Sequence, residues 1–193
     1  MKFRWILAAA LVAGASYLAG CTQPTPSHPS GKAKLEADAN ASVAGFKAED
    51  PSLQGMLNQA VGYAVFPDVG KAGFIAGASY GKGEVFEGGE KIGYADITQA
   101  TFGLQAGAQT FDELIIFLRP QDFKDFKDKE WALAANLSGV FIKPGAAATS
   151  DTSKGVVVFV RTKGGLMGEA AVGGQRFRFT SLAQAATQPS EPQ

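Results

Sequence analysis

The stretch that decides the fold is Gly62–Phe117, GYAVFPDVGKAGFIAGASYGKGEVFEGGEKIGYADITQATFGLQAGAQTFDELIIF. Short apolar runs alternate in it with glycines, and residues typical of turns recur at nearly regular intervals. This pattern predicts consecutive antiparallel strands. Gly88-Gly89 predicts a hairpin turn between two of them, and Pro67-Asp68 is a turn signal that we expect to end the first strand.

Glycines occupy one face of two of these expected strands. Gly73, Gly77 and Gly81 share one face of the first strand, and Gly103 and Gly107 share one face of the second. Faces without side chains allow another backbone to approach closely, and glycine also allows a sheet to bend. A closed barrel and an open sandwich both fit this pattern. The expected strands are Tyr63–Phe66, Ala72–Tyr80, Glu84–Glu87, Lys91–Thr98, Thr101–Thr110 and Glu113–Leu118.

The flanking sequence predicts helices on both sides of this block. Apolar residues near helical spacing predict a helix over 32–48, and Asp50-Pro51 reads as the start of a second helix. A partly amphipathic pattern predicts a third helix over 121–136. The last strands are expected at 140–142, 156–161, 165–172 and 176–179, with a loop over 145–154. The fold class predicted is α+β, with a glycine-rich, mostly antiparallel, strongly bent sheet or partly closed barrel, N-terminal helices and one helix inserted after the central meander.

Composition excludes several kinds of chemistry. The 193 residues carry 18 basic and 18 acidic side chains, so bulk charge does not support a nucleic-acid partner. The single cysteine, Cys21, and the single histidine, His28, exclude a disulfide framework, a Ser-His-Asp triad and a polyhistidine metal site. We therefore expect no cofactor, no metal and no catalytic role. The remote alternative, a hydrolase, would need a carboxylate pair, and nothing in the sequence brings any two of the candidates together. Those candidates are Asp96, Asp112, Glu113 and Glu169.

The N-terminus predicts a lipoprotein signal peptide over residues 1–20. Two cations precede an apolar run that is short for a membrane-spanning helix, and the run ends at Leu18-Ala19-Gly20-Cys21. These four residues resemble the bacterial lipobox, which implies cleavage before Cys21 and acylation of its thiol. Thr22 stands where an aspartate would favour retention in the inner membrane. The expected location is therefore the bacterial envelope, lipid-anchored in the outer membrane and facing the periplasm.

The rest of the chain divides into three expected segments. Residues 21–31 form a Pro/Ser-rich tether, residues 32–180 form the folded domain, and residues 181–193 form a disordered Ala/Gln/Pro-rich tail.

Four blocks of the domain, in order, resemble the SYLF domain family. They read GYAVFPDVGKAGF, GASYGKG, GYADITQATFGLQAGAQTFDELIIF and GVVVFVRTKGGLMGEAAVGGQRF, and the resemblance runs from about Pro51 to Phe179. It implies a lipid-binding module. Phosphoinositide binding and actin bundling are described for eukaryotic members. For this chain, with its expected bacterial lipid anchor, the resemblance implies affinity for an anionic membrane surface.

Five cations are the candidates for contact with lipid headgroups, because we expect them at strand ends or turns. They are Lys71, Lys82, Lys91, Arg161 and Lys163. If several share one edge they form a basic patch for lipid phosphates; the alternative is a scatter of solvated side chains. The leading hypothesis is thus a non-catalytic, lipid-anchored domain that binds anionic lipid at the membrane surface. The alternative is a module that binds a protein partner in envelope assembly or stress response.

Overall fold

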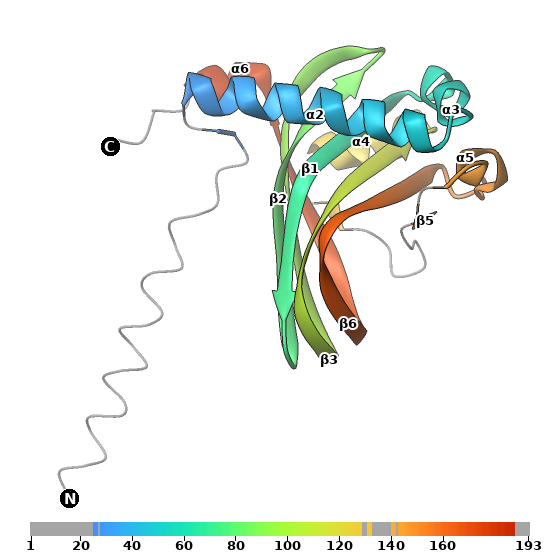
Figure 1. Ribbon diagram of the computed structural model, residues 1–193. Coiled ribbons are helices and arrows are strands. Elements are labelled where there is room, and N and C mark those ends of the chain that lie inside the picture. The colour runs from blue at the N-terminus through green and yellow to red at the C-terminus, as the bar shows by residue number, and fades with distance from the viewer. Residues whose placement is uncertain (1–24, 27, 129–130, 133–139, 142, 188–193) are drawn as a thin grey trace, which may run out of the picture.

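A computed structural model describes residues 25–26, 28–128, 131–132, 140–141 and 143–187, with the backbone alone for 103–105, 140–141 and 165–173 (Figure 1). The described residues form an α+β fold with one open sheet, which confirms the predicted class. The helices are α2 (Pro29–Glu49), α3 (Leu53–Gln59), α4 (Pro120–Asp128), α5 (Ala146–Thr149) and α6 (Leu182–Thr187). The strands are β1 (Gly62–Gly73), β2 (Ala76–Glu87), β3 (Glu90–Phe117), β4 (Trp131–Ala132), β5 (Val140–Phe141) and β6 (Val156–Ser181).

Strands β3 and β6 each turn back on themselves. Residues 90–102 of β3 are antiparallel to β2, and residues 107–117 are antiparallel to β1. Because β1 and β2 are antiparallel to each other, the two halves of β3 must run in opposite directions. Strand β6 pairs with β3 through the whole bend, from Gly93↔Ser181 to Phe117↔Val156. The central meander is therefore a sheet folded over itself.

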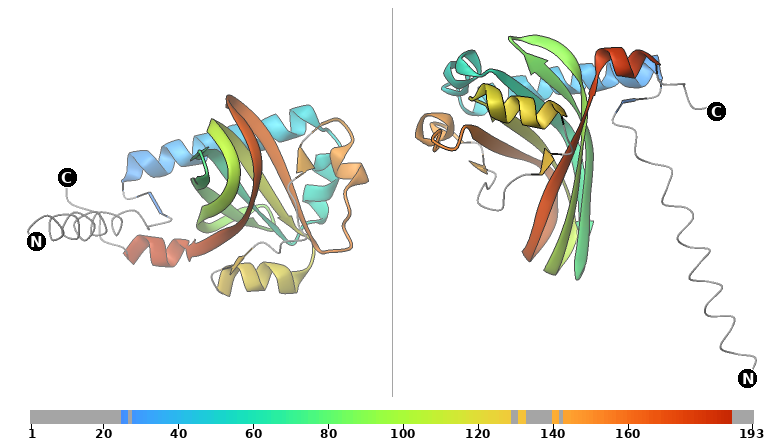
Figure 2. Two further views of the ribbon diagram at one scale, coloured as in Figure 1. Left: turned by 90° about the horizontal axis from the view of Figure 1, so that it is seen from below. Right: turned by 180° about the vertical axis from the view of Figure 1, so that it is seen from behind.

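The bends of β3 and β6 lie at the same end of the sheet as the β1–β2 turn. We call this the distal end; it comprises residues 72–78, 100–108 and 164–174. The five described helices lie at the opposite, helical end, and the strands extend well beyond them (Figures 1 and 2). The sheet does not close into a barrel. Short strands pair with the two arms of β6, β4 in antiparallel and β5 in parallel orientation.

Each face of the folded sheet has its own core at the helical end. The inner face contributes Phe66, Ile97 and Phe177 to a cluster that Phe123 and Phe126 of α4 complete. The outer face contributes side chains such as Leu114 and Phe159 to a second cluster, which α2, α3 and α5 cover. Because both faces are covered here, residues 111–117 are all buried and show no alternation of buried and exposed positions.

The first expected turn was wrong, for a reason visible in the pairing. Strand β1 continues through Pro67-Asp68, which forms a bulge where the register shifts against both β2 and β3. Asp68 adopts a positive φ of 58° there. A bulge tolerates the missing N–H of proline. The chain instead turns at Phe74-Ile75, inside the strand expected over 72–80, and β3 joins three expected strands into one.

Several helix boundaries also differ from the expected ones. Helix α2 begins at Pro29, within the expected tether, and α3 begins at Leu53 rather than directly after Asp50-Pro51. Helix α4 ends at Asp128, and Trp131–Ala132 of the expected helix form β4. The expected loop over 145–154 contains α5, and the expected tail contains α6, because Ala185 packs with Leu35 and Tyr94. The lipobox and Cys21 lie outside the described residues.

Two glycines in different surroundings test the close approach of layers in this fold. A Cβ at Gly83 would lie 2.4 Å from the Val65 carbonyl oxygen, whereas a Cβ at Gly55 of α3 would meet nothing within 4 Å. We expect Gly83→Ala to lower the free energy of unfolding by about 1–3 kcal/mol. Gly55→Ala should raise it by about 0.5–1 kcal/mol, because alanine favours the helix. Denaturant titrations of both variants measure these changes, and equal effects would contradict the proposed packing.

Candidate functional site

The five predicted cations do not come together on one edge. Only Lys91 lies next to a turn; the others lie inside β1, β2 and β6. Lys71 is on the inner face and only 8% exposed, in register with Ser79 and Gln109. Lys91, Arg161 and Lys163 are bound by acids at the helical end. Lys82 alone lies beside cations that were not predicted.

Lys91 joins helix α2 to the sheet. Its Nζ lies 3.0 Å from the fully buried Glu84 carboxylate and 2.5 Å from Glu36 of α2. Burial raises the pKa of Glu84, and the hydrogen bond from Lys91 opposes this. Burial also works against the charge of Lys91, but its hydrogen bonds to Glu36 and Glu84 raise its pKa above the ordinary value. Lys91 is therefore a structural cation that compensates a buried acid.

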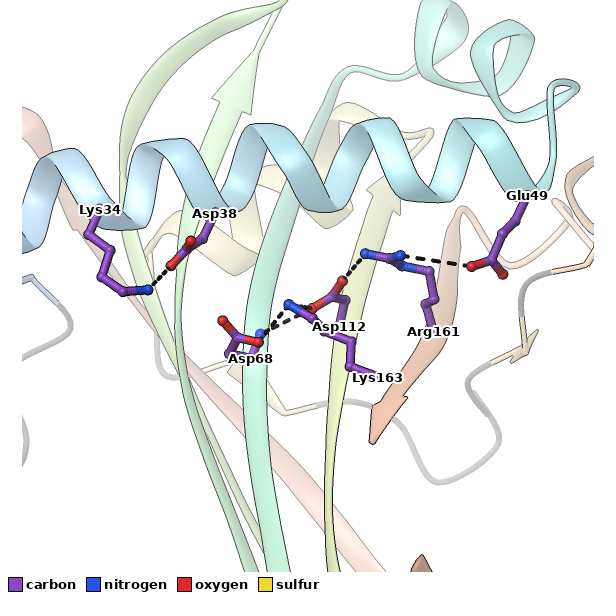
Figure 3. A network of polar contacts seen from close by, with 7 residues as sticks. All are labelled: Lys34, Asp38, Glu49, Asp68, Asp112, Arg161 and Lys163. Atoms are coloured by element: carbon purple, nitrogen blue, oxygen red, sulfur yellow. Dashed lines mark hydrogen bonds and ion pairs between the residues drawn. The ribbon is translucent and has the colours of Figure 1, made fainter. Parts of the chain in front are cut away.

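Asp112 organises a second set of ion pairs beneath α2 (Figure 3). Its fully buried carboxylate accepts a hydrogen bond from Arg161 at 2.5 Å and one from the Asp68 backbone N–H at 3.1 Å. Lys163 lies 2.6 Å from Asp68 and 3.4 Å from Asp112. Arg161 also reaches Glu49 of α2 at 3.8 Å. Two cations thus face three carboxylates, so this surface does not present a positive charge to an anionic lipid.

The outer face of β2, β3 and β6 carries a different arrangement. Lys82 pairs in register with Asp96, and Asp96 pairs with Arg178; the next outer pair towards the distal end is Thr98 and Arg176. Paired residues point to the same face of a sheet, so three cations surround one buried acid. We call Lys82, Arg176 and Arg178 the basic strip. A hollow of about 120 Å³ lies within it, lined by Asp96, Thr98, Arg176, Phe177 and Arg178.

Neither arginine of the basic strip was among the predicted lipid contacts. Their signal is the run Arg176-Phe177-Arg178-Phe179, in which cations and aromatic residues alternate. Such alternation places both guanidinium groups on one face of a strand and both rings on the other. Phe177 is indeed in the inner core, while Arg176 is exposed on the outer face.

Glu113 is the buried acid of the inner face. It is 1% exposed, and its Oε2 accepts a hydrogen bond from Gln175 Nε2 at 2.9 Å. Burial raises the pKa of Glu113 to about 7, which the hydrogen bond from Gln175 only partly offsets. Glu113 Oε1 and Gln175 Oε1 have no hydrogen-bond partner among the described residues. A proton on Glu113 would supply a donor in this place.

The three described candidates for a hydrolytic carboxylate pair, Asp96, Asp112 and Glu113, do not come together. Asp96 and Asp112 lie on outer positions of β3, next to Arg178 and Arg161 respectively. Glu113 lies on the inner face, and its hydrogen-bond partner is an amide. The side chain of Glu169 lies outside the described residues.

Comparison with models of protein families gives no match, and comparison with curated proteins gives none either. Among the helices of the described residues, none has the length and apolar character needed to cross a bilayer.

Glu113 makes the stability of the domain depend on pH. Its pKa is 4.5 in an unfolded chain and about 7 in the fold, so the folded state holds the proton more tightly. Glu113 contributes its full amount to the free energy of unfolding below pH 4.5. This contribution falls as the pH rises and is lost above about pH 7. The total loss is roughly 3 kcal/mol. Glu113→Gln should remove this slope in denaturant titrations between these pH values, and the exposed variant Glu90→Gln should keep it. Parallel curves for Glu113→Gln and the parent chain would contradict the assignment.

Proposed function

We propose that the protein is a lipid-anchored component of a bacterial envelope, and that its domain binds anionic phospholipid headgroups without catalysing a reaction. The observation that carries the headgroup site is the basic strip, in which Lys82, Arg176 and Arg178 surround the single acid Asp96. The lipobox ending at Cys21 supports the anchor. The resemblance to SYLF domains supports lipid as the ligand.

The chemistry of the strip suits phosphate. A guanidinium group presents planar, paired N–H donors that match phosphate oxygens, and Arg176 is exposed for such a contact. The hydroxyl of Thr98 lines the same hollow and can donate a further hydrogen bond. Each cation contributes about 1 kcal/mol near an anionic surface, so the strip alone gives weak binding.

Attachment therefore relies on two signals. Acyl chains on Cys21 hold the protein at the bilayer, since each buried methylene contributes about 0.8 kcal/mol. The tether then keeps the domain at a high local concentration near headgroups, and weak contacts suffice to orient it. In this proposal the acyl anchor keeps the protein at the bilayer, and the basic strip determines how the domain is oriented. The domain faces the periplasm from the outer membrane.

The alternative, a domain that binds a protein partner, has one structural observation in its favour. A hollow of about 530 Å³ lies between α3 and α5, with Met56, Leu118 and Arg119 in its lining. It is remote from the basic strip, so the two functions would depend on different residues.

The anchor is tested by Cys21→Ser in the full chain. Because the peptidase acts on the acylated cysteine, we expect an unprocessed precursor without lipid. Mass spectrometry of the protein from separated inner and outer membranes measures both the processing and the destination. A Cys21→Ser protein that still begins at residue 21 and stays in the membrane would refute the lipobox assignment.

The headgroup site is tested on a chain that begins at Thr22, which lacks the acyl anchor and retains every residue of both core clusters. Arg176→Gln with Arg178→Gln should weaken binding to phosphatidylglycerol vesicles about 30-fold, since two cations are lost. The matched control is Lys124→Gln with Lys143→Gln, two exposed lysines away from the strip. Vesicle sedimentation measures both. Equal binding by the arginine variant and its parent would exclude the strip.

A further inference from the structure

The distal end of the sheet exposes large apolar side chains. Phe74 is 72% exposed, Ile75 is 55% exposed and Phe102 is 73% exposed. They lie at the β1–β2 turn and where β3 begins its bend. Residues 72–81 and 97–111 contain no charged residue, and the bend of β6, residues 164–174, contains only Glu169. Exposed apolar groups of this size, gathered at one end, are unusual for a surface that faces only water.

The polarity of the sheet is also inverted at this end. Towards the helical end the inner positions are apolar, as at Phe66, Ile97 and Phe177. Towards the distal end the inner positions are polar: Lys71 and Ser79 are buried there, and the Ser79 hydroxyl lies 3.0 Å from Gln99 Oε1. The outer positions at the same level are exposed alanines and phenylalanines, namely Ala72, Phe74, Ala78, Ala100, Phe102 and Ala108. A one-sided sheet in water shows the opposite alternation.

We infer that the distal end inserts into the hydrocarbon boundary of a membrane leaflet. This inference rests on the proposed function and extends it: the domain would meet lipid through apolar side chains as well as through headgroups. The apolar outer positions would contact acyl chains, and the polar inner positions would stay enclosed by the folded sheet.

The position of the basic strip fits this insertion. Lys82 lies six residues beyond Ala76, the first residue of β2 after the turn, which is roughly 20 Å along a strand. The hydrocarbon region of one leaflet is about 15 Å thick. With the turn in the acyl region, Lys82, Arg176 and Arg178 would lie at the level of the phosphates. A tip whose only charged residue is Glu169 and cations at its base are thus spaced like the two zones of a leaflet.

The geometry favours a leaflet over a second copy of the chain. A second copy would pair along a free strand edge or cover one flat face. At the distal end β1 and β2 are paired on both sides, and β3 lies between them and β6, whose other edge has no partner strand there among the described residues. The exposed Phe74, Ile75 and Phe102 lie at the β1–β2 turn and on β3, not on the edge strand β6. A fluid medium can cover these side chains from all sides.

Depth measurements on the full, acylated chain test the insertion. Cys21 is the only cysteine, so Ile75→Cys or Phe102→Cys provides one free thiol for an environment-sensitive fluorophore. In phosphatidylglycerol vesicles we expect a blue shift at both positions and quenching by lipids that carry a nitroxide near the top of the acyl chain. The control is Asn58→Cys on α3, exposed at the helical end, which should show neither. Fluorophores at 75 and 102 that stay aqueous on vesicle-bound protein would overturn the inference.

The same experiment separates failure of the insertion from failure of the proposed function. If Cys21 is not acylated, the fluorophore will also label Cys21, which mass spectrometry detects, and the anchor fails. If the protein is anchored and positions 75 and 102 remain aqueous, only the insertion fails.

A second set of variants uses the chain that begins at Thr22. Phe74→Ser, Ile75→Ser and Phe102→Ser together should reduce vesicle binding at least tenfold, including at high salt, with no change in thermal midpoint because these side chains are exposed. The matched control is Leu182→Ser, which removes an apolar side chain that is 41% exposed at the helical end. Unchanged vesicle binding by the triple variant, with loss of a cross-linked dimer, would assign the tip to a second copy and overturn the inference.

Discussion

The rest of the structure depends on the ladder between β3 and β6, which stays paired while both strands reverse direction. Because neither strand can turn without the other, the sheet folds over as one unit and acquires an inner and an outer face. The two arms diverge at the helical end, where Phe123 and Phe126 of α4 fill the interior. Helices α2, α3 and α5 then cover the outer face. Helices α2, α3, α4 and α5 thus pack on the two faces that this shared bend creates.

Burial of both faces at the helical end decides what happens to the charges there. Glu84 and Asp112 are fully buried carboxylates, and such groups are costly unless a cation or several donors compensate them. Lys91 forms an ion pair with Glu84, and Arg161 and Lys163 form ion pairs with Asp112. Gly45 of α2 leaves room for the Arg161 guanidinium in its present position, because a Cβ there would lie 2.5 Å from it. Three of the five predicted lipid contacts therefore serve the fold.

The fold class could be predicted because alternation, glycine pattern and the Gly88-Gly89 turn are local signals. The bulge at Pro67-Asp68 could not, since pairing with β2 and β3 on both sides outweighs a local turn preference. The true turn, Phe74-Ile75, contains no residue typical of turns. The partners of the lysines depend on register across strands distant in sequence, which no local pattern specifies. Arg176 and Arg178 are the exception: their alternation with phenylalanine was readable in the sequence.

Three of the buried acids, Glu84, Asp112 and Glu113, differ in the face of the sheet on which they lie. Glu84 and Asp112 lie on outer positions, beneath α2, where strands and helix both contribute charged side chains. Glu113 lies on the inner face, in register with Phe66 and Val160. Its hydrogen-bond partner is the neutral Gln175, so binding a proton is the compensation available to it near neutral pH. Glu113 lies within the apolar core, because Val69 and Phe111 continue that core beyond it, and the inner face becomes polar at Lys71 and Gln109. At this level the outer face changes in the opposite sense, to exposed alanines and phenylalanines, and this reversal is the observation from which we infer insertion into a leaflet.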